Sequence, residues 1–281
     1  MSMEQVFDET ASHRLEAVYL TPDIVQQRKE FLTALALKPS EQVLDVGSGP
    51  GLLMTDMAPL VGPHGHVTGI DVSDSMLAVS RPRLAASPVR ERMSILKADA
   101  TRLPFQDAHF DAAVSTQVYE YVPDVDRALV ELYRVLRPGG RALILDTDWD
   151  SLVWNAEDAS LRNRLIDAWI KRFAHPHLPR TLQQRLKRAG FQVHGCKTLV
   201  LLNDTYDPNT YSLTNSDIMA EFVQQQGISA SDVAQWQHSL RELGLQDLYF
   251  FSLNRYLFRA TKPADAFHSQ TEPLVTPEAG E

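Results

Sequence analysis

The chain has 281 residues, a length typical of one large α/β domain or of one domain with an added subdomain. Hydrophobic residues make up 44% and charged residues 22%, which excludes a collagenous, a fully disordered or a coiled-coil protein. The net charge of −9 disfavours binding to the phosphates of a nucleic acid, so we expect no nucleic-acid partner. The single cysteine, Cys196, cannot form an intrachain disulfide, and we expect it to be buried in a strand.

The first residues do not have the pattern of a signal peptide. Residues 1–14 are polar and acidic and lack the apolar core of a signal peptide. No apolar run reaches the ~20 residues that span a bilayer. We therefore expect no membrane insertion and a cytoplasmic location. The tail, residues 262–281, is rich in Pro, Glu and Thr and is expected to be disordered.

The first half of the chain alternates amphipathic helical patterns with short apolar runs. A helix is predicted from Thr21 onward, because Thr can cap a helix that carries Pro22 at its first position. Five strands are predicted, in chain order at 42–46, 66–72, 93–97, 110–115 and 142–145. Helical patterns lie between these runs, and Ser73 caps one of the helices. The alternation predicts a parallel sheet with helices on both of its faces.

The second half is predicted to complete the sheet and to add helices. Residues 191–202 form a long predicted strand, and 248–260 are its expected antiparallel partner. The expected fold class is therefore α/β, a Rossmann-like, doubly wound, mostly parallel seven-stranded sheet with an antiparallel last strand and a helical cap. We expect an N-terminal helical lid (1–39), a main domain (40–261) with cap insertions at about 151–178 and 204–245, and the tail (262–281).

The most informative stretch is the glycine-rich run VLDVGSGPG, residues 43–51. A buried strand leads into a tight turn and then a helix, which lets backbone approach a ligand closely. A dinucleotide fingerprint would need glycine at position 52, which is Leu, and a P-loop would need Gly-Lys-Ser/Thr, which is absent. The carboxylate of Asp45 would repel a pyrophosphate and suits a ligand with an ammonium group. The alternative is a strand-to-helix turn that binds nothing.

Two further acids follow neighbouring predicted strands. Asp71 ends the second strand, where a carboxylate can accept both hydroxyls of a ribose, and Val72 beside it offers an apolar face to a purine. Asp99 follows the third strand and can accept from an exocyclic amine. The alternatives are a helix-capping or surface acid for Asp71 and a common turn residue for Asp99.

Together these residues resemble the class I S-adenosylmethionine-dependent methyltransferases over about residues 40–150. The resemblance rests on the Asp45-x-Gly47-x-Gly49-x-Gly51 loop, Asp71, Asp99, Phe110-Asp111 and the Leu136-Arg137-Pro138-Gly139-Gly140 turn. The segment Leu103-Pro104-Phe105 is similar to that of the ubiquinone/menaquinone-biosynthesis C-methyltransferases and their many small-molecule relatives. The resemblance implies that 40–261 is a methyltransferase domain.

The same resemblance implies S-adenosyl-L-methionine as the cofactor and assigns residues to it. The amino-acid end is assigned to the glycine loop, the ribose to Asp71, and the adenine amine to Asp99. The implied cofactor-binding residues are Tyr19, Asp45, Gly47, Ser48, Gly49, Asp71, Val72, Met76, Asp99, Ala100 and Gln117. Of these, Tyr19 is expected to close over the cofactor, and Gln117 to line its methionine portion.

Methyl transfer from a sulfonium is an in-line displacement, which needs alignment and exclusion of water, and a base only for some acceptors. Tyr119 and Asp148 follow strands four and five and are the candidate catalytic residues; an aromatic residue packed in the cap and a solvated acid are the alternatives. No metal is expected, since His64 and His66 lie in a surface turn.

The acceptor is predicted to be a small molecule. A methyltransferase acting on RNA or protein and a non-catalytic binding module are the alternatives. Residues 204–245 are rich in apolar and aromatic side chains. We expect them to line an acceptor pocket, or alternatively to form the interface of a homodimer.

Overall fold

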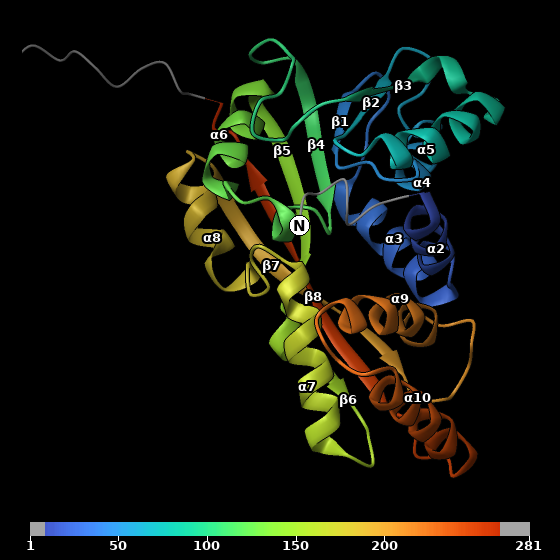
Figure 1. The fold of residues 1–281 in the computed structure, drawn as a ribbon. Coiled ribbons are helices and arrows are strands. Elements are labelled where there is room, and N and C mark those ends of the chain that lie inside the picture. The colour runs from blue at the N-terminus through green and yellow to red at the C-terminus, as the bar shows by residue number, and fades with distance from the viewer. Residues whose placement is uncertain (1–8, 265–281) are drawn as a thin grey trace, which may run out of the picture.

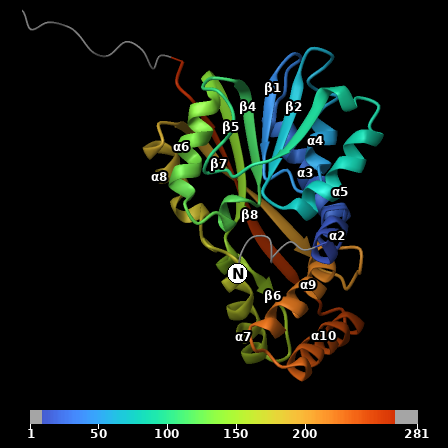
Figure 2. The same cartoon turned by 45° about the horizontal axis from the view of Figure 1, so that its top comes forward.

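One eight-stranded sheet runs through the molecule (Figures 1 and 2). The computed structural model describes residues 9–264. The strands are β1 (Gln42–Val46), β2 (His66–Asp71), β3 (Met93–Lys97), β4 (Phe110–Thr116), β5 (Leu136–Thr147), β6 (Val153–Trp154), β7 (Gln192–Asn203) and β8 (Phe251–Thr261). The helices are α2 (Glu9–Tyr19), α3 (Pro22–Leu35), α4 (Leu52–Met57), α5 (Asp74–Ala86), α6 (Val125–Val135), α7 (Ala159–Trp169), α8 (Pro179–Arg188), α9 (Tyr211–Gln225) and α10 (Ala230–Leu245).

The predicted α/β fold class is confirmed. The strand order is β3-β2-β1-β4-β5-β8-β6, with β7 paired to β8. β1 to β5 pair in parallel, whereas β8 is antiparallel to β5 and to β7. The sheet has one strand more than predicted, because Val153 and Trp154 pair with the first residues of β8 to form the short β6.

Helices cover both faces of the parallel part (Figure 1). On one face, Phe31 of α3 and Met54 of α4 pack against Val43 of β1, and α5 adds Leu84. On the other face, α6 and α8 pack against the same strands, with Leu129 among their fully buried residues. Both layers bury apolar stripes of amphipathic helices, which is what stabilises a doubly wound sheet.

The predicted helix starts at Thr21 and Ser73 are confirmed. Thr21 is the N-cap of α3, although its hydroxyl donates to the Val18 carbonyl oxygen at 2.8 Å instead of accepting. Ser73 is the N-cap of α5 and accepts from the backbone N–H of Met76 at 3.2 Å. This cap satisfies one of the orphan donors of the first helical turn.

Two local predictions are wrong. The glycine turn 137–140 is a bulge inside β5, because the Gly139 N–H donates to the Lys262 carbonyl oxygen and the Lys262 N–H donates to that of Gly140, both at 2.8 Å. Cys196 is exposed, because β7 pairs along only one of its edges within the described residues.

The long β7–β8 ribbon carries a second part of the molecule, which we call the helical lobe: α7, α9, α10, β6 and residues 251–254 of β8 (Figure 1). Residues 255–261 pair with β5, but 251–254 extend past its carboxyl end and pair with β7. The lobe has its own apolar core, in which Trp154 contacts Trp236 and Phe251 with ring centroids 5.1 and 4.9 Å apart.

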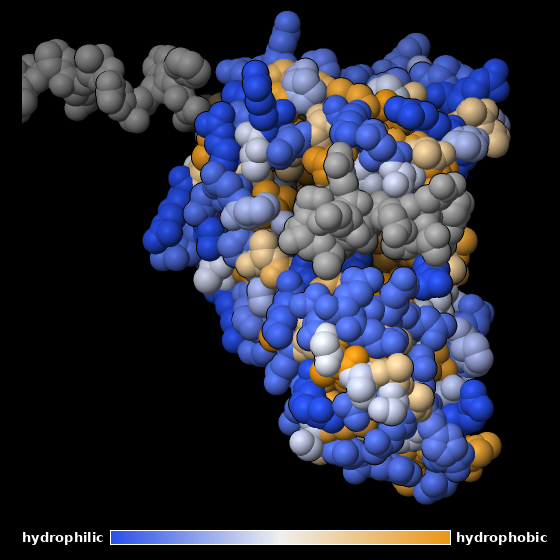
Figure 3. Space-filling view, viewed as in Figure 1, coloured by the Kyte–Doolittle hydropathy of each residue, from blue (hydrophilic) through white to orange (hydrophobic). Residues whose placement is uncertain are grey.

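The remaining segments frame these two parts. α2, within the predicted lid, lies against both α5 and α9. The tail predicted to be disordered falls, from residue 265, outside the described residues. Among the described helices, none combines the length and the apolar character that crossing a membrane would require. The face drawn in Figure 3 is largely hydrophilic, with hydrophobic side chains in small separate groups.

Candidate functional site

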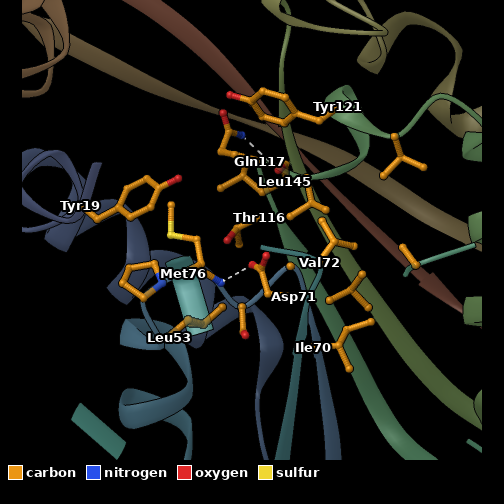
Figure 4. A pocket seen from close by; sticks show the side chains of 18 of the residues that line it. Tyr19, Leu53, Ile70, Asp71, Val72, Met76, Thr116, Gln117, Tyr121 and Leu145 are labelled. Atoms are coloured by element: carbon orange, nitrogen blue, oxygen red, sulfur yellow. Dashed lines mark hydrogen bonds between the residues drawn. The ribbon is translucent and has the colours of Figure 1, made fainter. Parts of the chain in front are cut away.

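A cavity lies at the carboxyl ends of β1, β2 and β4, bordered by α2 and α3 (Figure 4). β1 sits between β2 and β4, the point at which the strand order reverses and at which open α/β sheets place their ligands. Most predicted cofactor residues line this cavity, namely Tyr19, Gly47, Ser48, Gly49, Asp71, Val72, Met76, Asp99, Ala100 and Gln117. Asp45 and both candidate catalytic residues do not.

The glycine loop needs its glycines for two separate reasons. Gly47 and Gly49 have φ angles of 69° and 51°, in the left-handed region that favours glycine. A Cβ on Gly47 would also lie 2.3 Å from Cγ2 of Val118, whereas one on Gly49 would meet open space. The Ser48 N–H donates to the Ile70 carbonyl oxygen at 2.8 Å and ties the loop to β2.

Asp71 is held in place by backbone donors. Its Oδ2 accepts from the Gly49 N–H and its Oδ1 from the Ser73 N–H, both at 2.9 Å. Burial raises the pKa of Asp71, and these hydrogen bonds oppose the shift. The Val72 N–H also donates to this carboxylate, whose two oxygens offer about four lone-pair sites in all, so the oriented group can still accept from a hydroxyl of a ligand.

Asp45 does not face the ligand space, contrary to the sequence-based expectation. Its side chain is buried behind the loop, and its Oδ2 has no hydrogen-bond partner. Burial, reinforced by the negative charge of Asp71, raises the pKa of Asp45 to about 8. The group is therefore mostly protonated at neutral pH and is a poor partner for an ammonium group.

The far wall of the cavity is apolar with one acid at its edge. Met76 and Ala100 are buried and Val72 half-buried, beside the end of β2. Asp99 is exposed, and its Oδ1 accepts from the N–H and the hydroxyl of Thr101, both at 2.8 Å. These bonds fix the carboxylate and leave its second oxygen for a donor on a ligand.

Gln117 follows β4 in a strained backbone conformation, with φ at 57°. Its amide nitrogen donates to the Leu145 carbonyl oxygen at 3.1 Å, and its Oε1 accepts from the Thr147 hydroxyl. The side chain is thereby fixed at the edge of the cavity, on the side where Tyr121 lies in Figure 4.

Of the two tyrosines that follow β4, Tyr121 faces the cavity and Tyr119 does not. The expectation that Tyr119 is a catalytic residue is therefore wrong. Both belong to the 3₁₀ turn Tyr119–Tyr121, in which residues two apart point in different directions. Tyr119 is fully buried in the core under α6, and burial raises the pKa of its hydroxyl. Tyr121 lines the cavity, as does Tyr19 from the end of α2 (Figure 4).

Asp148 also points away from the cavity. Its Oδ2 accepts from Arg180 Nε at 2.7 Å, and its Oδ1 lies 3.1 Å from His177 Nδ1. Burial alone would raise the pKa of Asp148, but the bonds from Arg180 and His177 outweigh it and leave the pKa below its ordinary value. A carboxylate neutralised in this way is a structural ion pair and not a general base.

The same cluster has the composition of a metal site. Asp148, Asp150 and His177 each offer a ligand atom within 4.8 Å of the others. However, Arg180 donates to both carboxylates, at 2.7 Å to Asp148 and 2.6 Å to Asp150. The cationic guanidinium already occupies the oxygens that a metal would need.

Two cavity residues escaped the sequence-based analysis. Arg255 of β8 and Gln27 of α3 both line the cavity and are joined by a bond from Arg255 Nη1 to Gln27 Oε1 at 2.7 Å. The sequence offered one signal for Arg255, a charged residue within the apolar run FFSLNRYLF. Because alternate residues of a strand face the same side, this charge could have been expected to point inward.

A pair of buried acids lies close behind the cavity. Glu120 is buried and accepts from the Trp149 indole N–H at 3.0 Å. Burial raises the pKa of Glu120 to about 7. Burial and the neighbouring Glu120 also raise the pKa of Asp146 well above its ordinary value. Burial therefore disfavours the ionised form of both acids.

No residue of the predicted cap insertion 204–245 lines the cavity. Its apolar residues pack into the helical lobe instead, including Tyr211, Phe222 and Trp236. The insertion therefore supplies no wall of this cavity, which is bordered by α2, α3 and β8.

Residues 44–144 match the family model described as a methyltransferase domain. The sheet order and the glycine loop agree with this match, since both are typical of a Rossmann-like methyltransferase fold. The chain is 39% identical over 118 residues to the demethylmenaquinone methyltransferase of Symbiobacterium thermophilum, a match that covers 42% of this chain and 47% of the relative. It thus spans less than half the length of this curated relative.

Solved structures share the fold at lower identity. Phosphoethanolamine N-methyltransferase 2 of Haemonchus contortus superposes with a TM-score of 0.62 at 20% identity, covering 94% of this chain and 60% of that chain. The [4+2]-cyclase SpnF superposes with a TM-score of 0.55 at 22% identity, covering 85% of this chain and 80% of that chain. At these identities the likeness shows the fold alone.

Proposed function

We propose that this chain transfers a methyl group from S-adenosylmethionine to a small-molecule acceptor. The observation that carries the proposal is the oriented carboxylate of Asp71, which faces one cavity with the glycine loop on one side and Asp99 on the other. Nucleoside recognition needs this combination of a diol acceptor, a close backbone approach and an acceptor for an exocyclic amine. Two relatives described as methyltransferases, one of them solved with S-adenosylmethionine, are consistent with it.

Each part of the cavity has a role in this proposal. Asp71 holds the ribose hydroxyls, the wall of Val72, Met76 and Ala100 packs on the adenine, and Asp99 accepts from its amine. Gln117, fixed by Leu145 and Thr147, lines the methionine portion.

The bound cofactor supplies an electrophilic methyl on its sulfonium. The chain itself aligns the acceptor on the far side of that methyl and keeps water out, through the tyrosines at positions 19 and 121. Since neither Tyr119 nor Asp148 reaches the cavity, neither is proposed to move a proton.

A small-molecule acceptor is favoured over RNA because the chain is acidic overall. The predicted homodimer stays a prediction. The second candidate is a non-catalytic domain that binds S-adenosylmethionine without transferring its methyl group.

The test is calorimetry with S-adenosylhomocysteine, with NAD as the control, followed by transfer of labelled methyl from S-adenosylmethionine into pools of small metabolites, tRNA and protein. We expect micromolar binding, weak competition by NAD, and label only in the small-molecule pool. Label in the tRNA or protein pool would overturn the acceptor class. Tight NAD binding without a response to S-adenosylhomocysteine would overturn the cofactor. Binding without transfer to any pool would favour the second candidate.

A further inference from the structure

Arg255 is a buried cation at the inner end of the cavity. It is 4% exposed, and it lies opposite Thr147, at the carboxyl end of β5. Within the part of the chain that the structure describes, no carboxylate lies at ion-pair distance from its guanidinium, which bonds to Gln27 and contacts Tyr211 through a side-chain hydrogen bond and through the ring, 4.9 Å away. A charge removed from water without a counterion is costly unless something else pairs with it.

Hydrogen-bond donors are left over at the same place. Arg255 Nε has no acceptor, and neither has Nε2 of Gln27, a residue only 7% exposed. Both side chains line the cavity. Buried donors are nearly always satisfied in native proteins, so two adjacent unsatisfied donors indicate a missing acceptor group.

The surrounding acids do not pair directly with Arg255. Glu120 and Asp146 are buried outside the cavity lining, and burial raises the pKa of both, although the charge of Arg255 lowers each to a smaller extent. The second arginine of the cavity, Arg28, offers a contrast: its Nε donates to Asp56 at 2.7 Å and its Nη1 to the Tyr19 carbonyl oxygen at 3.0 Å. Arg28 is therefore bonded directly to a carboxylate, and Arg255 is not.

We propose that Arg255 and Gln27 form the anion-binding end of the acceptor subsite, and that the acceptor is an apolar or aromatic molecule carrying one carboxylate. Tyr19 and Tyr121 line the same cavity as Arg255 and Gln27, and Tyr121 lies near Gln117 in Figure 4. This inference rests on the proposed function, because it assumes that the cofactor fills the side of Asp71 and Asp99. The cofactor's own carboxylate is the other source of such a group, and the test separates the two.

The first measurement uses the wild-type chain saturated with S-adenosylhomocysteine. Two matched pairs of probes are titrated by ligand-observed NMR: 4-hydroxybenzoate against 4-hydroxybenzamide, and hexanoate against hexanamide. Each pair shares its apolar part and differs in charge. We expect the carboxylate of at least one pair to bind ten or more times as tightly as its amide. Equal affinity within both pairs would overturn the inference.

The second measurement compares variants. Arg255→Gln should abolish the preference for the carboxylate and leave the affinity for S-adenosylhomocysteine within about twofold, whereas Arg255→Lys should keep part of the preference. The matched control is Arg259→Gln, an exposed arginine on the same strand, which should change neither quantity. If Arg255→Gln instead weakens S-adenosylhomocysteine tenfold or more and keeps the preference, the anion is the cofactor's and the inference is wrong.

Two further controls distinguish an unfolded variant, a failure of the proposed function and a failure of the inference alone. Circular dichroism reports whether Arg255→Gln is folded; if it is not, Gln27→Leu replaces it and should reduce the preference. Failure of the wild-type chain to bind S-adenosylhomocysteine would overturn the proposed function and the inference with it. Binding of S-adenosylhomocysteine without any preference for carboxylates would overturn the inference alone.

Discussion

At Asp71 one carboxylate both holds the glycine loop and faces the cavity. Its oxygens accept from the backbone of Gly49 and Ser73, so the loop and the start of α5 are positioned by the same group that is proposed to bind the ribose. A ligand contact and a structural contact on one side chain cannot be lost separately. Substitution should therefore affect both binding and stability.

Asp71→Ala should weaken binding of S-adenosylhomocysteine by ~2–4 kcal/mol, or about thirty- to several-hundred-fold, because charged hydrogen bonds to the ribose are lost. It should also lower the free energy of unfolding by about 1–2 kcal/mol, because two backbone donors lose their acceptor. Calorimetry and urea unfolding measure the two effects. Asp74→Ala, which removes an exposed acid at the start of α5, is the control. Unchanged affinity in a folded Asp71→Ala protein would show that the carboxylate does not contact the ligand.

Gly47 and Gly62 form a matched pair for testing the glycine loop. Both have a φ of 69°, so alanine is equally strained at either position. A Cβ would meet Val118 at 2.3 Å at Gly47 but only ordinary contacts with Pro39, 3.7 Å away, at Gly62. Gly47→Ala should lower the affinity for S-adenosylhomocysteine at least tenfold, and Gly62→Ala should not. Both lose about 1 kcal/mol of stability from the strained backbone, and the clash with Val118 adds to the loss at Gly47. Equal affinities for the two variants would show that the glycine loop does not contact the ligand.

Asp45 should make the fold less stable as the pH rises. Its pKa is about 8 in the folded chain, against about 4 when unfolded. Between these values the folded state holds a proton that the unfolded state has released. Stability should therefore fall from about pH 4 to pH 8, by at most ~1.4 kcal/mol per pH unit from this group. Urea unfolding at pH 5.5 and 7.5 should show a smaller fall for Asp45→Asn than for the wild-type chain. A parallel fall in both proteins would place the pH dependence elsewhere.

At the scale of single elements, the sequence predicted the parallel strands and the glycine loop because their signals are local. A buried strand followed by glycines constrains its own backbone. The direction in which the side chains of the turn after β4 point is not set by local sequence. Whether Tyr119 or Tyr121 faces the cavity depends on how α6 packs. Arg255 was missed for a related reason: its counterpart Gln27 is 228 residues away, and only the folded sheet brings them together.

In the helical lobe, tertiary packing decides whether aromatic residues line a pocket or form a core. The aromatic residues of α9 and α10 were expected to line a pocket or an interface, yet they form a core with α7 and the start of β8. Trp236 is 2% exposed and contacts Trp154 edge to face. The role of the insertion therefore has to be tested by substituting a packed residue. Deleting the insertion would also expose the buried side chains of β8.

Trp236→Ala should lower the free energy of unfolding by ~3–5 kcal/mol, because it leaves a large cavity in the lobe. In the folded protein, the affinity for S-adenosylhomocysteine should stay within about twofold, since Trp236 does not line the cavity. Leu245→Ala on the same helix is the control, because Leu245 is 76% exposed. Thermal unfolding and calorimetry on the two variants decide the matter. A tenfold loss of affinity in folded Trp236→Ala would mean that the lobe controls the cavity.

At the scale of the whole molecule, α2 connects the two parts across the cavity. Glu16 forms an ion pair with Arg83 of α5, and Arg14 forms one with Glu221 of α9. Arg83 Nε also donates to the Pro50 carbonyl oxygen at 2.9 Å, so the first pair links α2 to the glycine loop itself. These contacts make α2 the element that would have to move for the predicted lid to open.

Loosening these ties should therefore speed ligand release. Glu16→Gln should raise the release rate of S-adenosylhomocysteine severalfold, while the free energy of unfolding changes by less than about 1 kcal/mol, because partly exposed ion pairs contribute little to stability. Stopped-flow displacement measures the rate. Glu30→Gln, which removes an ion pair with Lys197 outside the cavity lining, is the matched control and should leave the rate unchanged. Because salt screens exposed charges, the difference between wild type and Glu16→Gln should shrink from low ionic strength to about 1 M salt. Equal release rates at low ionic strength would show that α2 is a fixed wall of the cavity and not its lid.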